Sequence, residues 1–210
     1  VRLRSGAFDL TVVAGYPPPL WARGLKLALQ KKAVTQTWSW ARGEVEAAPY
    51  RSTPLLAMDV DSSLGIRSTG EEVSELSVGE QGKGRQTLSG DLASDFLEEL
   101  EFCSVGTFYK KAWPTYFGPM GETSTIDHMM LPRGARRLVR SCKVLWQVGR
   151  RLQLIPSSRP RDHMPMMMEL DYELAPEPPR ELHSRWDLTK LGQALQFGQG
   201  RIDLLEEMQV

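Results

Sequence analysis

Six acidic and histidine residues occur in pairs at the end of one expected strand, within a second and at the start of a third. They are Asp59 with Asp61, Asp127 with His128, and Asp162 with His163. Carboxylates at the ends of neighbouring strands meet at one edge of a sheet, where they repel each other unless a cation or a histidinium lies among them. Such hard oxygen ligands suit Mg²⁺ or Mn²⁺ better than zinc. A histidine beside them can orient a phosphate oxygen or transfer a proton when another carboxylate fixes its tautomer.

Each pair also has a purely structural interpretation. An aspartate at a strand end is often a turn former, and His128 is expected to face solvent from its strand. The methionines from Met164 to Met168 fit core packing better than a metal-binding motif. His183, beyond a proline-rich stretch, is assigned no role. The case for a site therefore depends on the order and context of the pairs together.

The elements expected in the first third of the chain place acids and an aromatic residue at strand ends. Residues Phe8 to Tyr16 alternate as a strand, and the prolines that follow must end it, which presents Tyr16 at its end. Leu20 to Ala33 reads as a helix, and Trp38 to Ser52 as a polar connection. The apolar run TPLLAMDV, from Thr53 to Val60, predicts a buried strand that ends in acids.

The remaining elements are predicted from shorter patterns. The stretch SGDLASDFLEELEF predicts an amphipathic helix with Ser89 or Asp91 as its N-cap. Short strands are expected at SVGTFYKKA, PTYFG, STIDHMML and SCKVLWQVG, and the alternation from Met164 to Leu174 predicts a half-buried strand. The sequence GEQGKG lacks the residues and flanking elements of a phosphate-binding loop, so that interpretation is rejected.

Composition narrows the class of protein. The 210 residues carry no net charge and are 41% hydrophobic, which excludes a disordered or fibrous chain. A balance of 26 basic and 26 acidic residues also argues against binding to nucleic acid through overall charge alone. Charge is nevertheless uneven, because Arg133 to Arg161 holds nine basic residues and no acid. This segment either faces a polyanion or forms a solvated surface.

The two cysteines, Cys103 and Cys142, lie in apolar stretches without metal-binding spacing, so we expect buried, reduced thiols and an intracellular protein, nuclear or cytoplasmic. No apolar run approaches the roughly 18 residues that a membrane span needs. We expect one domain over residues 1–174, a proline-rich linker over 175–180 and a helical tail over 181–210. Because the first residues read as a strand already under way, the chain is expected to be the carboxy-terminal portion of its domain.

Four motifs, in order along residues 1–174, resemble the endonuclease/exonuclease/phosphatase superfamily. GYPPP is similar to its Tyr-x-Pro strand end, and LLAMDVDSSLG to its apolar strand followed by Gly-Asp-x-Asn. TFYKKAWPTYFGPMGETSTIDHMML resembles the stretch that ends in Ile-Asp-[Tyr/His], and RPRDHMPMMMEL resembles the Ser-Asp-His-x-Pro signature. The glycine-rich loop before the SGDLASDFL helix is similar to that of the retroelement-type (non-LTR) endonuclease domains in this superfamily.

The resemblance implies an α/β fold, a truncated four-layer sandwich of two mixed β-sheets flanked by helices, and a Mg²⁺ (or Mn²⁺) cofactor. It also implies roles for seven residues. Asp59 would help to activate water, Asp61 takes the place of the family's asparagine, and Asp127 supports the catalytic histidine. Asp162 and His163 form the last acid and histidine of the site, with Asp162 as a metal ligand. Tyr16 and Arg161 contact the substrate. The implied partner is nucleic acid, DNA rather than RNA, with no membrane involved.

Departures from the family pattern imply a weakened site. The family's strand asparagine and its metal-binding glutamate have no counterpart, and Asp61 can only accept a hydrogen bond where asparagine would donate one. Met58 stands in place of a glycine, and Arg161 in place of a serine. The expectation is a partial or degenerate magnesium-dependent endonuclease, inactive as this fragment. The alternatives are a non-catalytic remnant or binding module of the same fold, or a phosphatase acting on a small phosphoester.

Overall fold

The computed structural model describes residues 1–6, 8–19, 25–153 and 162–172. The chain divides into two compact units, Val1–Leu174 and Ala175–Val210. The second unit lies wholly outside the described residues, and so do the predicted linker, the predicted helical tail and Arg161.

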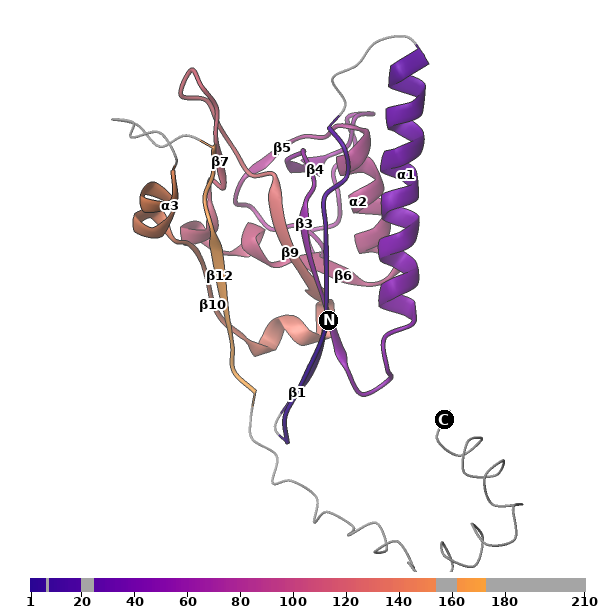
Figure 1. Ribbon diagram of the computed structural model, residues 1–210, viewed down its shortest axis with the longest axis vertical. Coiled ribbons are helices and arrows are strands. Elements are labelled where there is room, and N and C mark those ends of the chain that lie inside the picture. The colour runs from indigo at the N-terminus through magenta and orange to yellow at the C-terminus, as the bar shows by residue number, and fades with distance from the viewer. Residues whose placement is uncertain (7, 20–24, 154–161, 173–210) are drawn as a thin grey trace, which may run out of the picture. The chain divides into compact units, whose positions relative to one another are not determined.

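A five-stranded mixed sheet forms the centre of the first unit (Figure 1). Its strands, in spatial order, are β1 (Arg2–Arg4), β2 (Asp9–Gly15), β3 (Thr53–Asp59), β9 (Asp127–Pro132) and β6 (Phe102–Ser104). Strands β2 and β3 are parallel, and the other neighbours pair antiparallel. The β3–β9 register aligns Leu56 with Met130 and, at the strand ends, Asp59 with Asp127.

The remaining strands form three small sheets. They are the antiparallel pair β10 (Val139–Val144) and β12 (Met166–Leu170), the three-stranded sheet β11 (Asp162–His163), β7 (Tyr116–Phe117) and β8 (Thr123–Ser124), and the parallel pair β4 (Leu64–Ile66) and β5 (Lys83–Arg85). The helices are α1 (Leu25–Glu46), α2 (Leu88–Glu99) and α3 (Trp146–Leu152), with short 3-10 helices η1 (Val105–Phe108), η2 (Lys110–Ala112) and η3 (Arg133–Leu138). No helix in the described ranges is long and apolar enough to cross a membrane.

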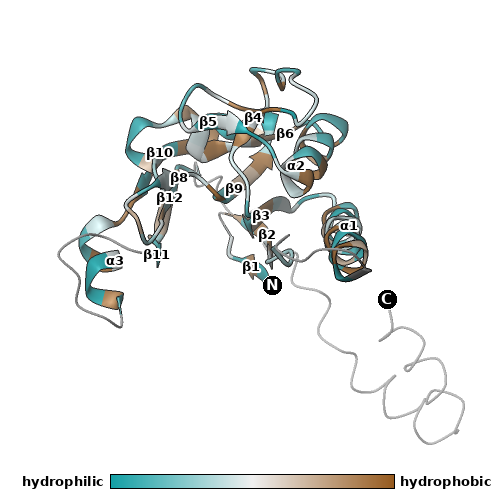
Figure 2. Ribbon diagram, turned by 90° about the horizontal axis from the view of Figure 1, so that it is seen from above, coloured by the Kyte–Doolittle hydropathy of each residue, from teal (hydrophilic) through white to brown (hydrophobic). Residues whose placement is uncertain are grey.

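The central sheet is packed on both faces. Helices α1 and α2 lie on one side of it, and β10, β12 and α3 lie on the other (Figure 2). Side chains of successive strand residues point to opposite faces, so Leu56 and Met130 join the core beneath the helices, whereas Leu55 and Leu131 pack toward β10 and β12. The predicted α/β class with mixed sheets and flanking helices is confirmed, and Cys103 and Cys142 are buried free thiols, as expected.

Helix α1 corrects the predicted connection from Trp38 to Ser52. The helix continues to Glu46 because Trp38, Ala41 and Val45 recur at helical spacing and are all buried. Trp38 also contacts Phe96 of α2, with ring centroids 5.7 Å apart. An amphipathic pattern with a tryptophan on its apolar face therefore explains this segment better than a polar loop does.

Three further sequence-based boundaries also differ from the structure. The N-cap of α2 is Thr87, whose side chain accepts from the Gly90 N–H, rather than Ser89 or Asp91. Most of the stretch SVGTFYKKA forms η1 and η2 instead of a strand. In SCKVLWQVG the strand ends at Val144 and α3 follows from Trp146.

Candidate functional site

Two carboxylates face each other at the end of the central sheet. Asp59 is the last residue of β3, Asp127 is the first of β9, and the two are direct partners in the antiparallel ladder. Directly opposed residues project from the same face of a sheet, and like charges in this position are destabilising. The ladder therefore places a repulsive acidic pair where a counter-charge is needed.

His163 supplies that counter-charge from β11. Its strand pairs with β7, so that His163 lies opposite Tyr116, and the two rings make an edge-to-face contact at 5.1 Å. Asp162 adopts a positive φ of 68°, and its Oδ1 accepts the His163 N–H at 2.9 Å. The positive φ and this hydrogen bond change the direction of the chain at Asp162, and the His163 imidazole projects toward β3 and β9.

The three side chains converge. His163 Nδ1 lies 3.0 and 3.1 Å from the two carboxylate oxygens of Asp127, and His163 Nε2 lies 3.7 Å from Asp59 Oδ2. One ligand atom from each of the three residues lies within 4.8 Å of the others. The structure thus brings together three predicted site residues that are far apart in sequence, while their catalytic roles stay predictions.

The electrostatics of the cluster follow from this geometry. The hydrogen bond with Asp127, together with the charges of Asp127, Asp59 and Asp162, raises the pKa of His163 to about 9, although burial acts in the opposite direction. Burial raises the pKa of Asp59, and the charge of Asp127 raises it further. At neutral pH an imidazolium therefore lies between two carboxylates.

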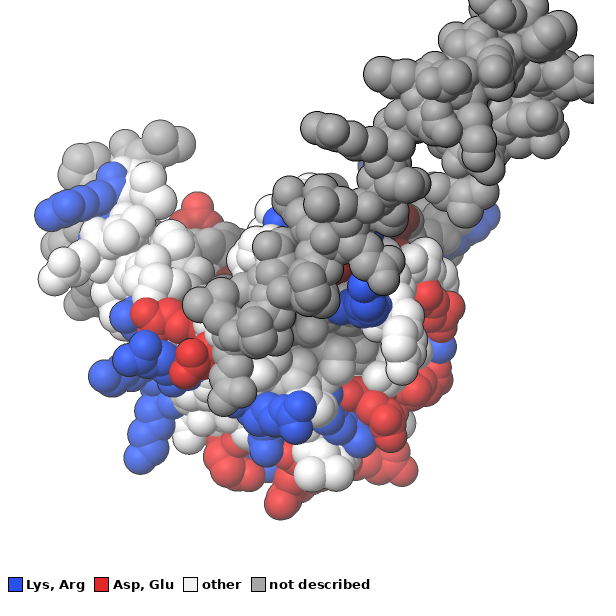
Figure 3. All heavy atoms as spheres, turned by 90° about the horizontal axis from the view of Figure 1, so that it is seen from below, with Lys and Arg blue, Asp and Glu red and all other residues white. Residues whose placement is uncertain are grey.

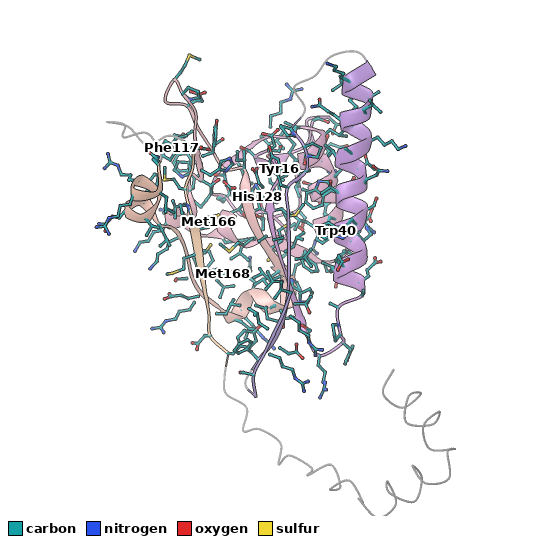
Figure 4. All side chains as sticks on the ribbon, in the orientation of Figure 1. Tyr16, Trp40, Phe117, His128, Met166 and Met168 are labelled. Carbon is teal, nitrogen blue, oxygen red and sulfur yellow. The ribbon has the colours of Figure 1, made fainter. Side chains whose placement is uncertain are left out.

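Other predicted site residues border this cluster. Asp61 has a φ of 52° in the turn after β3, and its N–H donates to Asp59 Oδ1 at 3.1 Å. Asp162 is exposed, with Oδ1 3.8 Å from His163 Nε2, and it is not one of the three converging ligands. Tyr16, at the end of β2, is 58% exposed, and its pKa is raised by burial and then by the charges of Asp59 and Asp61. Figure 4 shows Tyr16 near the same end of the sheet as His128.

His128 contradicts the prediction that it faces solvent, because it is only 3% exposed. Its Nε2 lies 3.1 Å from the Ser62 carbonyl oxygen and its Nδ1 2.9 Å from Ser104 Oγ. Since a carbonyl can only accept, Nε2 carries the proton and Nδ1 accepts from the serine hydroxyl. Burial lowers the pKa of His128. The prediction failed because both faces of β9 are covered. His128 lies on the face toward the helices, so its side chain does not reach water.

Thr115 is a positioning residue that the sequence did not reveal. Its buried hydroxyl oxygen accepts the N–H groups of Ile126 and Asp127, each at 3.1 Å. Its carbonyl oxygen accepts the Met164 N–H at 2.7 Å. Thr115 therefore joins the start of β9 to the segment that carries His163. The only signal was a threonine between Pro114 and Tyr116 in the stretch already matched to the family, and spacing alone does not distinguish it.

A hollow of about 370 Å³ lies against the cluster, between the central sheet and the chain around His163. Its remaining walls are apolar in large part and include Ala57, Met129, Pro165 and Met166. A mainly apolar cavity with a few convergent polar groups is typical of a ligand site. The apolar walls also lower the local dielectric, which strengthens the interaction of the charged groups with an ion or substrate.

The donor set fits a hard divalent cation in part. Two carboxylates supply oxygen ligands of the kind that Mg²⁺ and Mn²⁺ prefer, and Mg²⁺ is commonly held by one or two carboxylates with water completing its shell. The imidazole can join only when deprotonated, since a protonated nitrogen has no lone pair to donate. Asp59 and Asp127 are therefore the best candidate ligands, with His163 as their charged neighbour.

Comparisons with known proteins place this geometry in a fold. No known family model matches the chain, and no curated protein does. Among solved structures, a 3′ phosphatase, NExo, from Neisseria, bound to a product DNA hairpin, is 13% identical with a TM-score of 0.53; the match covers 81% of this chain and 64% of that one. An AP endonuclease from Archaeoglobus fulgidus is 14% identical with a TM-score of 0.52, over 81% and 64% of the two chains.

The chain therefore shares its fold with a solved 3′ phosphatase and a solved AP endonuclease, in agreement with the fold that the motifs predicted. The chain spans less than two thirds of the length of these solved structures. The endonuclease domain of TRAS1, a telomere-specific non-LTR retrotransposon, is 16% identical over 81% of this chain and 60% of that one, with a TM-score of 0.46. At this low similarity the retroelement type stays a prediction.

Proposed function

We propose that the chain is part of a metal-dependent phosphodiesterase that acts on nucleic acid, DNA rather than RNA. The observation that carries this proposal is the convergence of Asp59, Asp127 and His163 within 4.8 Å beside a hollow. The fold supports it, since solved structures with this fold include an AP endonuclease and a 3′ phosphatase bound to DNA. The identity between those proteins and this chain is low, so the site rather than the fold must carry the chemistry.

The residues of the chain divide the work according to their protonation. Asp59 Oδ2, which lies 3.7 Å from His163 Nε2 beside the hollow, accepts the proton of the attacking water. His163 Nε2–H, oriented by Asp127 at Nδ1, donates to a non-bridging phosphate oxygen, and the Tyr16 hydroxyl donates to another. A bound Mg²⁺ or Mn²⁺ would polarise the phosphate and stabilise the leaving oxygen, with Asp59 and Asp127 as its candidate ligands. Asp61 and Asp162 border the same site, and their predicted roles, like the substrate contact predicted for Arg161, stay predictions.

A second candidate is a non-catalytic binding module of the same fold. It is favoured by the small ligand set, because a protonated His163 cannot bind a metal, which leaves only the Asp59 and Asp127 carboxylates of the three converging residues that the structure describes. Asp61 favours it as well, since a carboxylate near the substrate repels an anionic phosphate. We infer that hydrolysis by this chain alone is weak, and that the site needs a further metal ligand to reach full activity.

The test is nicking of supercoiled plasmid DNA by the full chain, with Mg²⁺ or Mn²⁺ and with a chelator. Asp59→Asn and His163→Gln should each reduce metal-dependent nicking about 10²–10⁴-fold, the range for loss of a proton-transfer group. Asp171→Asn, which removes an exposed acid from the end of β12, is the matched control and should nick as the parent does. Undiminished nicking in the two site variants would refute the assigned roles. Metal-dependent DNA binding by the parent without nicking would establish the second candidate instead.

A further inference from the structure

A second hollow lies at the opposite end of β9 from the two carboxylates. It measures about 610 Å³, and its walls are Phe108, Tyr109, Arg133, Arg136, Arg137 and Val139. The arginines come from η3, which follows β9 directly at the lower end of the sheet in Figure 1. Five residue steps separate Asp127 from Pro132, so the two hollows are roughly 16 Å apart along the strand at about 3.3 Å per residue. We call this second site the arginine hollow.

Two of its three guanidinium groups are held in fixed positions. Arg133 Nη2 donates to Ser77 Oγ at 2.8 Å, and its Nε donates to the Phe102 carbonyl at 3.4 Å. The guanidinium carbon of Arg136 lies 4.3 Å from the centroid of the Phe108 ring, in a cation–π contact. A planar group that is already positioned loses less conformational entropy when it binds an anion.

The aromatic wall of the hollow is also fixed. The Tyr109 hydroxyl donates to the Val139 carbonyl oxygen at 2.9 Å, which holds this side chain against β10. Phe108 carries Arg136 on its ring, so the wall and one cation form a single unit. The hollow therefore combines preorganised positive charge with a rigid aromatic surface, and its volume lies in the range of small-molecule sites.

Within the described part of the chain, the arginines of the hollow have no acidic partner. Among the residues that the structure describes, no carboxylate lies within ion-pair distance of Arg133, Arg136 or Arg137. Elsewhere in the same unit Arg67 is paired with both Asp95 and Glu98. The charges of Arg136 and Arg133 also act together on the buried Cys103 thiol, where they oppose the rise in its pKa caused by burial. Within the described residues, the positive charge of this hollow is therefore not compensated by ion pairs.

Figure 3 views the molecule from the end at which η3 lies, and it shows Lys and Arg side chains on this face in separate groups, with acidic ones between them. A broad basic surface would bind any polyanion. Here three arginines from one six-residue 3-10 helix, η3, line a single hollow. Arginine clusters also recognise acidic peptide motifs, so competition by polyglutamate is part of the test, but an acidic peptide makes no use of the aromatic wall. A compact anion with an attached ring is the better match for this shape.

We propose that the arginine hollow binds the phosphate of a nucleotide, either free or within a strand, at a site separate from Asp59 and His163. Guanidinium groups match phosphate oxygens with paired hydrogen bonds, and Phe108 and Tyr109 provide apolar surface for the sugar or base. This site goes beyond the proposed hydrolysis and does not require it. A strand that occupied both hollows would have to follow the sheet from one end of β9 to the other.

The experiment uses the full 210-residue chain without metal, so that cleavage plays no part. Adenosine 5′-monophosphate is titrated by calorimetry, and a fluorescein-labelled single-stranded oligonucleotide by anisotropy. In the double variant Arg136→Gln, Arg137→Gln, affinity should fall at least about tenfold for each probe that the parent binds, and the salt slope for the oligonucleotide should fall by about 1 to 2. The matched control is Lys31→Gln with Lys32→Gln, which removes the same charge from the exposed side of α1 and should bind as the parent does.

The two probes distinguish the source of the phosphate. Binding of both probes identifies a free-nucleotide site, whereas binding of the oligonucleotide alone identifies a strand-binding site, and either supports the proposal if the arginine variant loses it. The proposal is overturned if neither probe binds the parent, or if the arginine variant binds with unchanged affinity. It is also overturned if the lysine control loses as much affinity as the arginine variant. A third contrary outcome is that polyglutamate competes for the site as effectively as unlabelled oligonucleotide does. Absence of nicking in the plasmid assay would leave these binding results unaffected, so the two proposals fail separately.

Discussion

Two histidines lie beside Asp127, and the fold places them in opposite environments. His128 follows Asp127 in the chain and is 3% exposed, with both ring nitrogens hydrogen-bonded inside the protein. His163 comes from β11, its side chain is 41% exposed, and it lies between Asp127 and Asp59. Burial lowers the pKa of the first, whereas the neighbouring carboxylates raise the pKa of the second to about 9.

The difference shows that neighbouring residues of one strand can have a structural role and a candidate catalytic role. Alternate residues of β9 face opposite sides, so Asp127 projects toward the open hollow and His128 toward the closed core beneath the helices. The buried neutral imidazole holds the turn after β3 through the Ser62 carbonyl. The open charged imidazole compensates the acidic pair. Four changes can break or sharpen this comparison.

The largest expected effect is on stability, at the closed site. His128→Ala leaves the Ser62 carbonyl and the Ser104 hydroxyl without their partner and creates a cavity, so the free energy of unfolding should fall by about 2–4 kcal/mol. His163→Ala, at the open site, should cost less than about 1 kcal/mol, because exposed ion pairs contribute little. Urea denaturation measures both. Equal losses in the two variants would show that the closed and open environments do not differ as described.

The second change tests which carboxylate controls the open histidine. Asp127→Asn should lower the pKa of His163 from about 9 by roughly one unit or more, because the hydrogen bond with Asp127 is the main cause of its elevation. Asp59→Asn removes only a charge at a longer distance and should lower the pKa by less. The imidazole proton shifts in NMR titrations give both values. A larger shift in the Asp59 variant would reverse the assignment.

The third change concerns the link between β9 and β11. Thr115→Val keeps the shape of the side chain but removes the oxygen that accepts two N–H groups, so stability should fall by about 1–2 kcal/mol. Thr115→Ser keeps the oxygen and should recover most of that loss. The same denaturation assay applies, and the His163 resonances report whether the imidazole has moved. A valine variant as stable as the parent would remove Thr115 from its assigned role.

The smallest expected effect is the pH dependence of stability. The pKa of His163 is raised in the folded state, so its contribution is complete below about 6.5 and is lost as pH rises toward about 9. The pKa of His128 is lowered, so its contribution is present above 6.5 and is lost as pH falls below that value. The alkaline loss should stay below about 1 kcal/mol, given the exposure of His163. A His163→Gln variant should lack the alkaline loss and keep the acid loss, and the opposite result would contradict both assignments.

The sequence predicted the parts of this arrangement that depend on local pattern. The apolar run from Thr53 to Val60 placed Asp59 at the end of a strand, and the ordered motifs indicated that Asp127 and His163 belong to one site. It failed where a residue's environment is set by distant segments. The burial of His128 depends on the helices that cover β9, and the role of Thr115 depends on hydrogen bonds to segments on either side of it in the fold. The extension of α1 was readable from the spacing of Trp38, Ala41 and Val45, but the polar residues between them obscured it.

The ladder between β3 and β9 has a consequence for how this sequence can change. Main-chain hydrogen bonds, not loops, fix the separation of Asp59 and Asp127, so most neighbouring side chains can be replaced without moving the two acids apart. Insertion of a single residue early in β9 would shift the phase of the strand, turning a histidine outward and an aspartate into the core. Substitutions near the site should therefore accumulate over evolution, whereas length changes in these two strands should be rare.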